Sequence, residues 1–192
     1  FDEIDDAKDL IQFLRDEEVE CADLDYFEAS IIRKEGDVEE AKKLYKDLID
    51  NFENQECEIE FVSELYLYYI DMIFYTNDED EILELCEKGL KYDEKNQGLL
   101  YYKALALYYK DELDDAKDIY EYLDEIYPDN SYSNQKLGDI YREKGNYDKA
   151  LEYYNKQIEL NYDITDYFRR IEVNFDMFNM DDVYEDLIYL ER

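Results

Sequence analysis

The stretch SYSNQKLGDIYREKGNYDKALEYYNKQIELNYDI, residues 131–164, predicts two short amphipathic helices joined by a tight turn. Leu137 and Tyr141 are one helical turn apart on the first helix, and Ala150 and Tyr154 are one turn apart on the second. Each helix therefore has one apolar stripe along a single face. Two such stripes joined by a short turn predict an antiparallel helix pair.

Small residues indicate where the two helices touch. Gly138 lies beside the apolar stripe of the first helix, and Ala150 lies in the stripe of the second. Small side chains allow two helix backbones to approach closely. The Gly145-Asn146 pair between the helices is typical of a turn.

This stretch resembles the tetratricopeptide repeat, a 34-residue helix–turn–helix unit. The matching residues are Leu137-Gly138, Tyr141, the turn at 145–147, Ala150 and Tyr154. The stretch departs from the family at Gln157, where a small residue is preferred, and at Tyr162, where proline is preferred. The resemblance implies an all-α fold: a right-handed superhelical α-solenoid of stacked antiparallel helix pairs with a concave groove.

The same pattern recurs along nearly the whole chain. Ala7 and Ala41 are 34 residues apart, as are Ala116 and Ala150, while Ile82 follows Ala41 by 41 residues and so indicates an insertion. We expect one solenoid over residues 1–192, with an orphan second helix at 1–21, repeats at 22–55, 63–96, 97–130 and 131–164, an insertion at 56–62 and a divergent last repeat at 165–192.

The insertion has two interpretations. It lengthens a helix by about two turns, or the alternation of Cys57, Ile59 and Phe61 forms a short strand. At the ends of the chain, Phe1 falls in the middle of a repeat and Arg192 follows no polar capping helix. We therefore expect a piece of a longer protein, or an end face that associates with another molecule.

The last repeat is the most divergent copy. Phe168, Ile171 and Phe175 predict its first helix, and Val183 lies on the second, reached by a turn one residue shorter than usual. With this spacing Glu172 falls at the place of the small residue.

Composition favours a packed but strongly charged domain. The chain carries 55 acidic against 21 basic residues, a formal net charge of −34, yet 17% of its residues are aromatic, unlike acidic disordered tails. So negative a surface repels nucleic acid and anionic membranes and attracts basic ligands, although it also serves plain solubility. No apolar run approaches the roughly 18 residues of a membrane span, and no signal peptide is visible.

The supply of reactive side chains argues against an enzyme. The chain has no His, and its three cysteines, Cys21, Cys57 and Cys86, are widely spaced and form no C-x-x-C pair. A zinc site, a His-dependent nucleophile and a bound cofactor are therefore not expected. We predict free thiols in a reducing, cytoplasmic compartment, with Cys86 as a buried structural thiol.

The resemblance implies that the first helices of the repeats line a concave groove. The corresponding places here are aromatic in the middle of the array and acidic around it. We expect the binding site at Leu67, Asp71, Phe74, Tyr75, Tyr101, Leu105, Tyr108, Tyr109 and Asp139. Some members of the family clamp a C-terminal carboxylate with Lys, Asn and Arg side chains in the groove. In this chain those places carry Tyr26, Ser30, Leu67, Asp71, Tyr101 and Leu105.

The predicted function is that of a protein–protein interaction scaffold. Its partner is expected to be a protein or peptide with apolar and basic side chains, because aromatic rings are good anchors and carboxylates attract cations. The alternative for the rings is a compositional bias, since the chain has 23 Tyr. Alternatives for the whole chain are self-association through its uncapped ends, near Phe175, Phe178 and Leu190, or recruitment of substrate for a larger enzyme or regulator.

Overall fold

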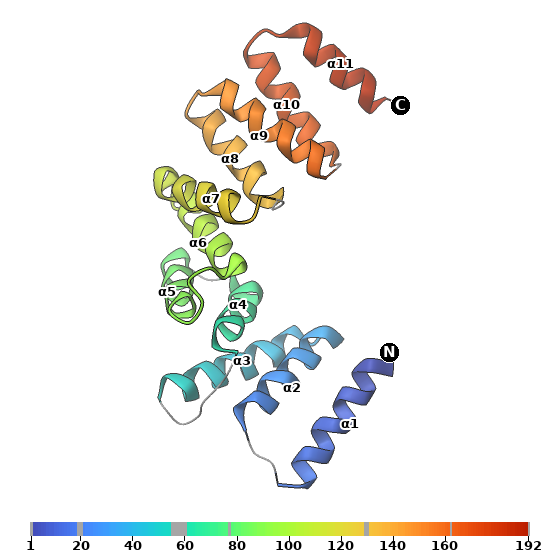
Figure 1. Cartoon of the computed structure of the whole chain (residues 1–192), viewed down its shortest axis with the longest axis vertical. Helices are drawn as coiled ribbons and strands as arrows, with labels where there is room; N and C mark the ends of the chain where they lie inside the picture. Colours follow the sequence, from blue (N-terminus) through green and yellow to red (C-terminus); the bar gives the residue numbers. More distant parts are fainter. Residues whose placement is uncertain are drawn as a thin grey trace. The chain divides into compact units, whose positions relative to one another are not determined.

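The computed structural model describes residues 2–18, 21–54, 61–76, 78–128, 131–161 and 163–191, and within these ranges it is all-α (Figure 1). The helices are α1 (Asp2–Asp16), α2 (Ala22–Glu35), α3 (Val38–Glu53), α4 (Val62–Ile73), α5 (Glu79–Leu90), α6 (Gln97–Tyr109), α7 (Leu113–Ile126), α8 (Ser131–Glu143), α9 (Tyr147–Leu160), α10 (Ile164–Asp176) and α11 (Met180–Leu190). The chain divides into two compact units, Phe1–Ala106 and Leu107–Arg192. None of the described helices has the length and apolar character needed to cross a bilayer.

In the first unit, helices that follow one another in the chain pack together. Contacts join α1 to α2, α2 to α3, α3 to α4 and α4 to α5. Ala41, Tyr45 and Leu48 are buried on α3, which confirms the apolar stripe predicted for that helix. The first part of α6 completes the unit, with Lys103 Nζ 3.1 Å from Glu87 Oε1 on α5.

The second unit repeats this arrangement from α7 to α11. Contacts join α7 to α8, α8 to α9, α9 to α10 and α10 to α11. Leu137, Ala150 and Tyr154 are fully buried. A Cβ added to Gly138 would lie 2.4 Å from Cε1 of Tyr154, so the predicted close approach at a small residue is confirmed.

Four of the turns inside helix pairs share one backbone conformation. Gly36, Asp111, Gly145 and Phe178 all have positive φ, at 95°, 63°, 72° and 61°. After Gly145, the Asn146 side chain accepts a hydrogen bond from the backbone N–H of Lys149 and caps α9. The Gly145-Asn146 turn predicted from the sequence is therefore confirmed.

Two further predictions concern cysteines. Cys86 is buried on α5, which confirms its predicted burial, and that burial raises the pKa of its thiol to about 12. The insertion at 56–62 falls mainly on residues 55–60, so Cys57, the longer helix and the short strand lie outside the described residues.

The last helix pair follows the previous one at a spacing of 33 residues. Helices α8 and α10 are both 13 residues long and begin at Ser131 and Ile164, and α9 and α11 begin at Tyr147 and Met180. The turn before α11 is therefore as long as the turn before α9, and the shortening comes before α10. Glu172 is exposed, not at a close helix contact.

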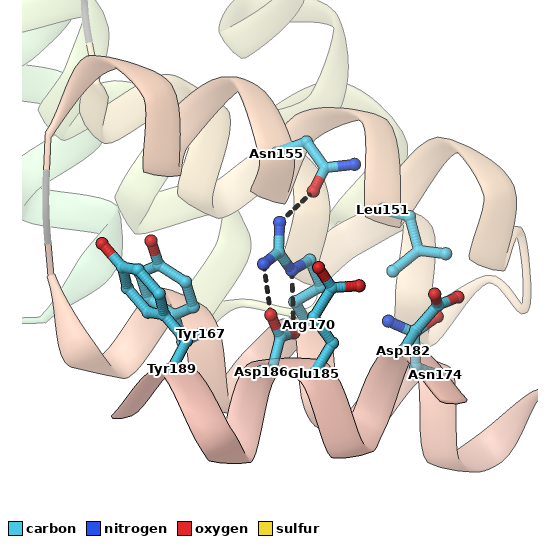
Figure 2. A pocket seen from close by; sticks show the side chains of 9 residues that line it. All are labelled: Leu151, Asn155, Tyr167, Arg170, Asn174, Asp182, Glu185, Asp186 and Tyr189. Atoms are coloured by element: carbon cyan, nitrogen blue, oxygen red, sulfur yellow. Dashed lines mark hydrogen bonds and ion pairs between the residues drawn. The ribbon is translucent and has the colours of Figure 1, made fainter. Parts of the chain in front are cut away.

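This spacing shows which side chains replace the repeat's core residues. Arg170 stands in the place of Leu137, and Asn174 in the place of Tyr141. Arg170 donates from Nε to Oδ2 of Asp186 at 2.9 Å and from Nη2 to Oδ1 of the same carboxylate (Figure 2). An ion pair thus occupies part of what is an apolar contact one repeat earlier.

Candidate functional site

The binding residues predicted on α4 are partly engaged inside the first unit. The ring of Phe74 is buried, 5.1 Å from the ring of Tyr102. Asp71 accepts a hydrogen bond from the hydroxyl of Tyr102 and lies 3.9 Å from Nη1 of Arg33. Tyr75, by contrast, is 82% exposed.

The predicted residues on the first part of α6 are similar. Leu105 is buried in the core, and Leu67 on α4 lies where a Cβ on Gly98 would be. Tyr101 is half-buried, with its ring edge-on to that of Tyr102 at 5.7 Å. Phe74 and Leu105 therefore serve the core of the first unit and are not surface anchors.

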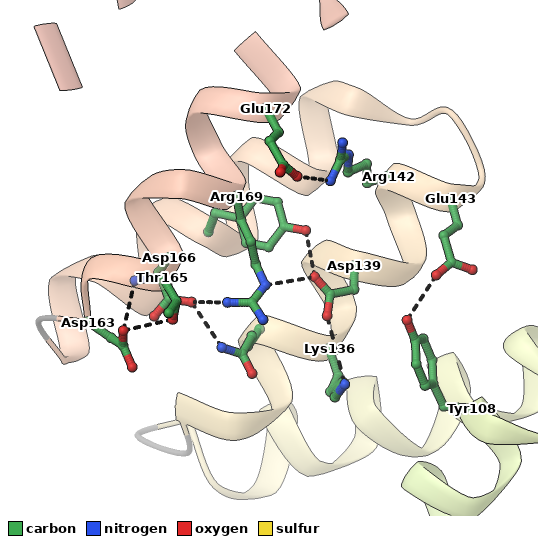
Figure 3. A network of polar contacts seen from close by, with 12 residues as sticks. Tyr108, Lys136, Asp139, Arg142, Glu143, Asp163, Thr165, Asp166, Arg169 and Glu172 are labelled. Carbon is green, nitrogen blue, oxygen red and sulfur yellow. Dashed lines mark hydrogen bonds and ion pairs between the residues drawn. The ribbon is translucent and has the colours of Figure 1, made fainter. Parts of the chain in front are cut away.

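In the second unit, Tyr108 and Asp139 lie together in a groove formed mainly by α8 and α10 (Figure 3). We call it the α8–α10 groove, and its volume is about 610 Å³. Its lining residues are Tyr108, Asp139, Arg142, Glu143, Tyr147, Thr165, Phe168, Arg169, Glu172 and Asp176. Tyr109, also predicted, is exposed beside Tyr108, with ring centres 5.9 Å apart.

Asp139 joins the helices on both sides of the α8–α10 groove. Its Oδ1 accepts from the Tyr154 hydroxyl at 2.8 Å and lies 3.2 Å from Nε of Arg169, while its Oδ2 lies 3.9 Å from Nζ of Lys136. Burial and the Asp139 carboxylate raise the pKa of Tyr154, which keeps the phenol protonated as a donor. Asp139 is therefore largely committed to holding the groove together.

Arg142 and Tyr108 hold the groove's outer carboxylates. Arg142 pairs with Glu172 and lies 3.5 Å from Oδ2 of Asp176. Burial lowers the pKa of Arg142, but the Glu172 carboxylate together with Tyr154 and Asp176 outweighs it, and the net pKa is raised. The Tyr108 hydroxyl donates to Glu143 at 2.9 Å, and the ring lies 4.6 Å from Nζ of Lys136.

A buried carboxylate supports the start of α10. Asp166 is fully buried, and its Oδ1 accepts from Nε2 of Gln135 at 3.1 Å and from Nη1 of Arg169 at 3.3 Å. The preceding Asp163 caps the helix by accepting from the backbone N–H of Thr165 at 2.8 Å. These contacts fix α10 and the position of Arg169 across the groove.

The sequence prediction did not place α10 in the site because it assumed a 34-residue spacing. The positions of α8 that face the predicted groove are Tyr132, Gln135, Asp139, Arg142 and Glu143. At the observed spacing of 33 they correspond to Thr165, Phe168, Glu172, Phe175 and Asp176, and all but Phe175 of these line the α8–α10 groove. One signal in the sequence does give this spacing. Asn146 and Asp148 at the start of α9 recur as Asn179 and Asp181 at the start of α11.

Comparison with known proteins supports the repeat pattern. Family models described as tetratricopeptide repeat match residues 131–164 and residues 26–54 and 99–130. No curated protein matches the chain by sequence.

Similar solved structures share the fold at low sequence identity. MamA of Desulfovibrio magneticus RS-1 (41–end) is 17% identical, with a TM-score of 0.69 over 88% of this chain and 91% of that one. The pilF protein of Pseudomonas aeruginosa is 12% identical, with a TM-score of 0.72 over 90% and 76%. YrrB, described as a TPR protein with an unusual peptide-binding site, is 14% identical, with a TM-score of 0.68 over 92% and 87%. The segments that match the family models fold into stacked helix pairs, as the family's repeats do. The chain belongs to the tetratricopeptide-repeat family, whose fold is that of protein-interaction scaffolds.

Proposed function

We propose that the α8–α10 groove binds a peptide segment of a partner protein with basic and apolar side chains. The charges of the groove support a basic ligand, because four carboxylates line it against two guanidinium groups. The carboxylates are Asp139, Glu143, Glu172 and Asp176, and the guanidinium groups are those of Arg142 and Arg169. Carboxylates in excess attract cationic side chains and speed their encounter.

The observation that carries the proposal is Phe168, whose ring is 49% exposed although it lines the groove. An aromatic ring in a groove gives a large apolar contact at low entropic cost, as binding anchors do. Phe168 therefore supplies the apolar contact, and the carboxylates around it supply the preference for basic residues.

Other features support a peptide as the ligand. YrrB, which is similar in fold, is described as having a peptide-binding site. On the first unit, the exposed ring of Tyr75 and the half-exposed ring of Tyr101 are further candidate contacts with a peptide. The proposed role is binding, and it includes no chemical step.

The test uses two fluorescent peptides of equal length, one alternating leucine with arginine and one alternating leucine with glutamate, titrated with the full chain. We expect the leucine–arginine peptide to bind more tightly. Phe168→Ala should weaken its binding about tenfold, which corresponds to about 1.4 kcal/mol. Fluorescence anisotropy measures both affinities.

The matched control is Phe178→Ala, because Phe178 is also an exposed phenylalanine but lies outside the groove. It should leave the affinity unchanged. Equal effects of the two substitutions, or equal affinity for the two peptides, would contradict the proposal.

A second candidate function is self-association through α11. Tyr184, Leu187 and Ile188 expose large apolar surfaces on this helix. The net charge opposes contact between two copies, so association should strengthen as salt screens it. Light scattering that finds only monomers from low to high salt would exclude this candidate.

We also propose a reducing compartment, the cytoplasm. Its support is that both described cysteines, the exposed Cys21 and the buried Cys86, are free thiols. Alkylation of thiols in intact cells tests this, and a disulfide at Cys21 would contradict it.

A further inference from the structure

A second cavity lies between α9 and α11 (Figure 2), and none of its lining residues lines the α8–α10 groove. Its volume is about 480 Å³. It is lined by Leu151 and Asn155 of α9, Tyr167, Arg170 and Asn174 of α10, and Asp182, Glu185, Asp186 and Tyr189 of α11. We call it the α9–α11 cavity. Both α9 and α11 pack on α10, so α10 forms its floor.

The preceding repeat fills the equivalent space with its own side chains. There the rings of Tyr141 and Tyr153 stack with centres 5.6 Å apart and planes 6° apart. Nζ of Lys149 lies 4.6 Å from the centre of the Tyr141 ring and 3.1 Å from its hydroxyl. Two rings and a cation therefore close the space between α7 and α9.

All three of these side chains are replaced in the last repeat. At the 33-residue spacing, Tyr141 corresponds to Asn174, Tyr153 to Asp186 and Lys149 to Asp182. Two large rings have become small polar groups, and the cation has become a carboxylate. The α9–α11 cavity thus lacks the two rings and the cation that occupy the equivalent space one repeat earlier.

Asn174 indicates that a ligand completes this cavity. Its side chain is only 4% exposed and lines the cavity. Its Oδ1 accepts from Nδ2 of Asn179 at 3.4 Å, but its own Nδ2 has no acceptor among the residues that the structure describes. Asn174 lines the cavity, so this donor is placed to hydrogen-bond to an acceptor that a ligand brings.

The charges in the cavity favour a cation. Arg170 and Asp186 neutralise each other in their bidentate pair, and Nη1 of Arg170 also donates to Asn155 at 2.6 Å. The charge of Asp182 also raises the pKa of Arg170, so this carboxylate acts on the same guanidinium group. The cavity nevertheless holds three carboxylates, those of Asp182, Glu185 and Asp186, against one guanidinium group.

We propose that the α9–α11 cavity binds the side chain of an arginine from a partner peptide. The guanidinium donates to the carboxylates of Asp182 and Glu185, which match its planar fork of N–H groups. The backbone carbonyl of the bound arginine accepts from Nδ2 of Asn174. The ligand then supplies the cation that Lys149 supplies within the preceding repeat.

The probe is N-acetyl-L-arginine amide, titrated into the full isotope-labelled chain. The control ligand is N-acetyl-L-citrulline amide, which has nearly the same shape but no charge. We expect saturable shifts of the Asn174 side-chain amide in the NMR spectrum with the arginine ligand. The citrulline ligand should bind at least about tenfold more weakly.

Three variants locate the binding. Combining Asp182→Asn with Glu185→Gln should weaken arginine binding about tenfold or more, and Asp182→Lys should abolish it by placing a cation where Lys149 stands one repeat earlier. The matched control, Asp181→Asn, changes a neighbouring carboxylate that does not line the cavity and should have no effect. Thermal melting checks that each variant is folded.

Two results would overturn the proposal: equal binding of the citrulline ligand, or unchanged affinity in the double variant. Phe168→Ala distinguishes this cavity from the groove, because it should weaken the leucine–arginine peptide without shifting the response of Asn174.

Discussion

Individual residues in the turns carry the same backbone conformation with very different side chains. Gly36 and Gly145 adopt positive φ without steric cost, whereas Asp111 and Phe178 adopt it with a Cβ present. The left-handed conformation costs an ordinary L-residue about 1–2 kcal/mol. Phe178 is also 83% exposed, so no buried contact offsets that cost.

We predict that Phe178→Gly stabilises the protein. Removal of the left-handed strain outweighs the greater entropy of glycine in the unfolded chain, and the net gain should be about 0.5–1 kcal/mol. Urea denaturation measures the free energy of unfolding. Gly145→Ala, which introduces the strain at the equivalent turn, should lower it by about 1 kcal/mol. A loss of stability in Phe178→Gly would contradict this account.

The structural role of a residue could be predicted from its place in the repeat pattern where its contacts lie within one helix pair. The close contact at Gly138 and the burial of Cys86 follow from their places in the pattern. The burial of Phe74 and Leu105 did not, because a repeat position gives the face of a helix but not what covers it. Phe74 faces the predicted groove side, yet the ring of Tyr102 from the next repeat packs on it.

Among the helices, α10 and α11 depart most from the family's packing. Their existence was predictable from apolar periodicity, but their register was not, because a shorter link before α10 shifts every later place by one residue. The polar substitutions that form the α9–α11 cavity become visible only with the corrected spacing. The groove residues of α10 were missed for the same reason, whereas Tyr108 and Asp139, both among the predicted binding residues, line the α8–α10 groove.

We predict that the Arg170–Asp186 pair is strongly coupled. Asp186 is 5% exposed, so Asp186→Ala leaves a largely buried guanidinium without its partner and should cost about 3 kcal/mol. Combining Arg170→Leu with Asp186→Leu should return the stability to within about 1 kcal/mol of the parent, because two apolar side chains replace the buried pair and Leu137 already stands at the place of Arg170 one repeat earlier. Urea denaturation of both variants measures this. A cost below about 0.5 kcal/mol for Asp186→Ala, the level of an exposed site, would show that the pair is uncoupled.

For the whole molecule, the sequence predicted the class of fold and most of the helix pairs. It predicted one uninterrupted solenoid, and it did not indicate that contacts divide within α6, after Ala106. In a solenoid each repeat contacts only its neighbours. The residue pattern of the repeats can therefore stay regular at a point where the contacts between neighbouring helices become fewer. Composition was informative about charge, but it could not show which of the many tyrosines are buried.

The tyrosines determine how the molecule responds to alkaline pH. Burial, with neighbouring carboxylates, raises the pKa of Tyr153 to about 12, and burial also raises the pKa of Tyr66, Tyr102 and Tyr154 above the usual value near 10. A folded pKa above the unfolded one stabilises the fold below pH 10 and ceases to do so as the pH rises through the folded value. Each tyrosinate formed also adds to a net charge that is already −34.

We therefore predict cooperative alkaline unfolding between about pH 10 and pH 12. The absorbance of tyrosinate should rise in two phases, and the second phase should come from buried rings such as Tyr66 and Tyr154 as the helices melt. Circular dichroism should lose its helical signal together with the second phase. Added salt should move that phase to higher pH, because it screens the repulsion among carboxylates and tyrosinates. Ionisation of all tyrosines near pH 10 with the helical signal intact would show that burial does not hold these phenols protonated.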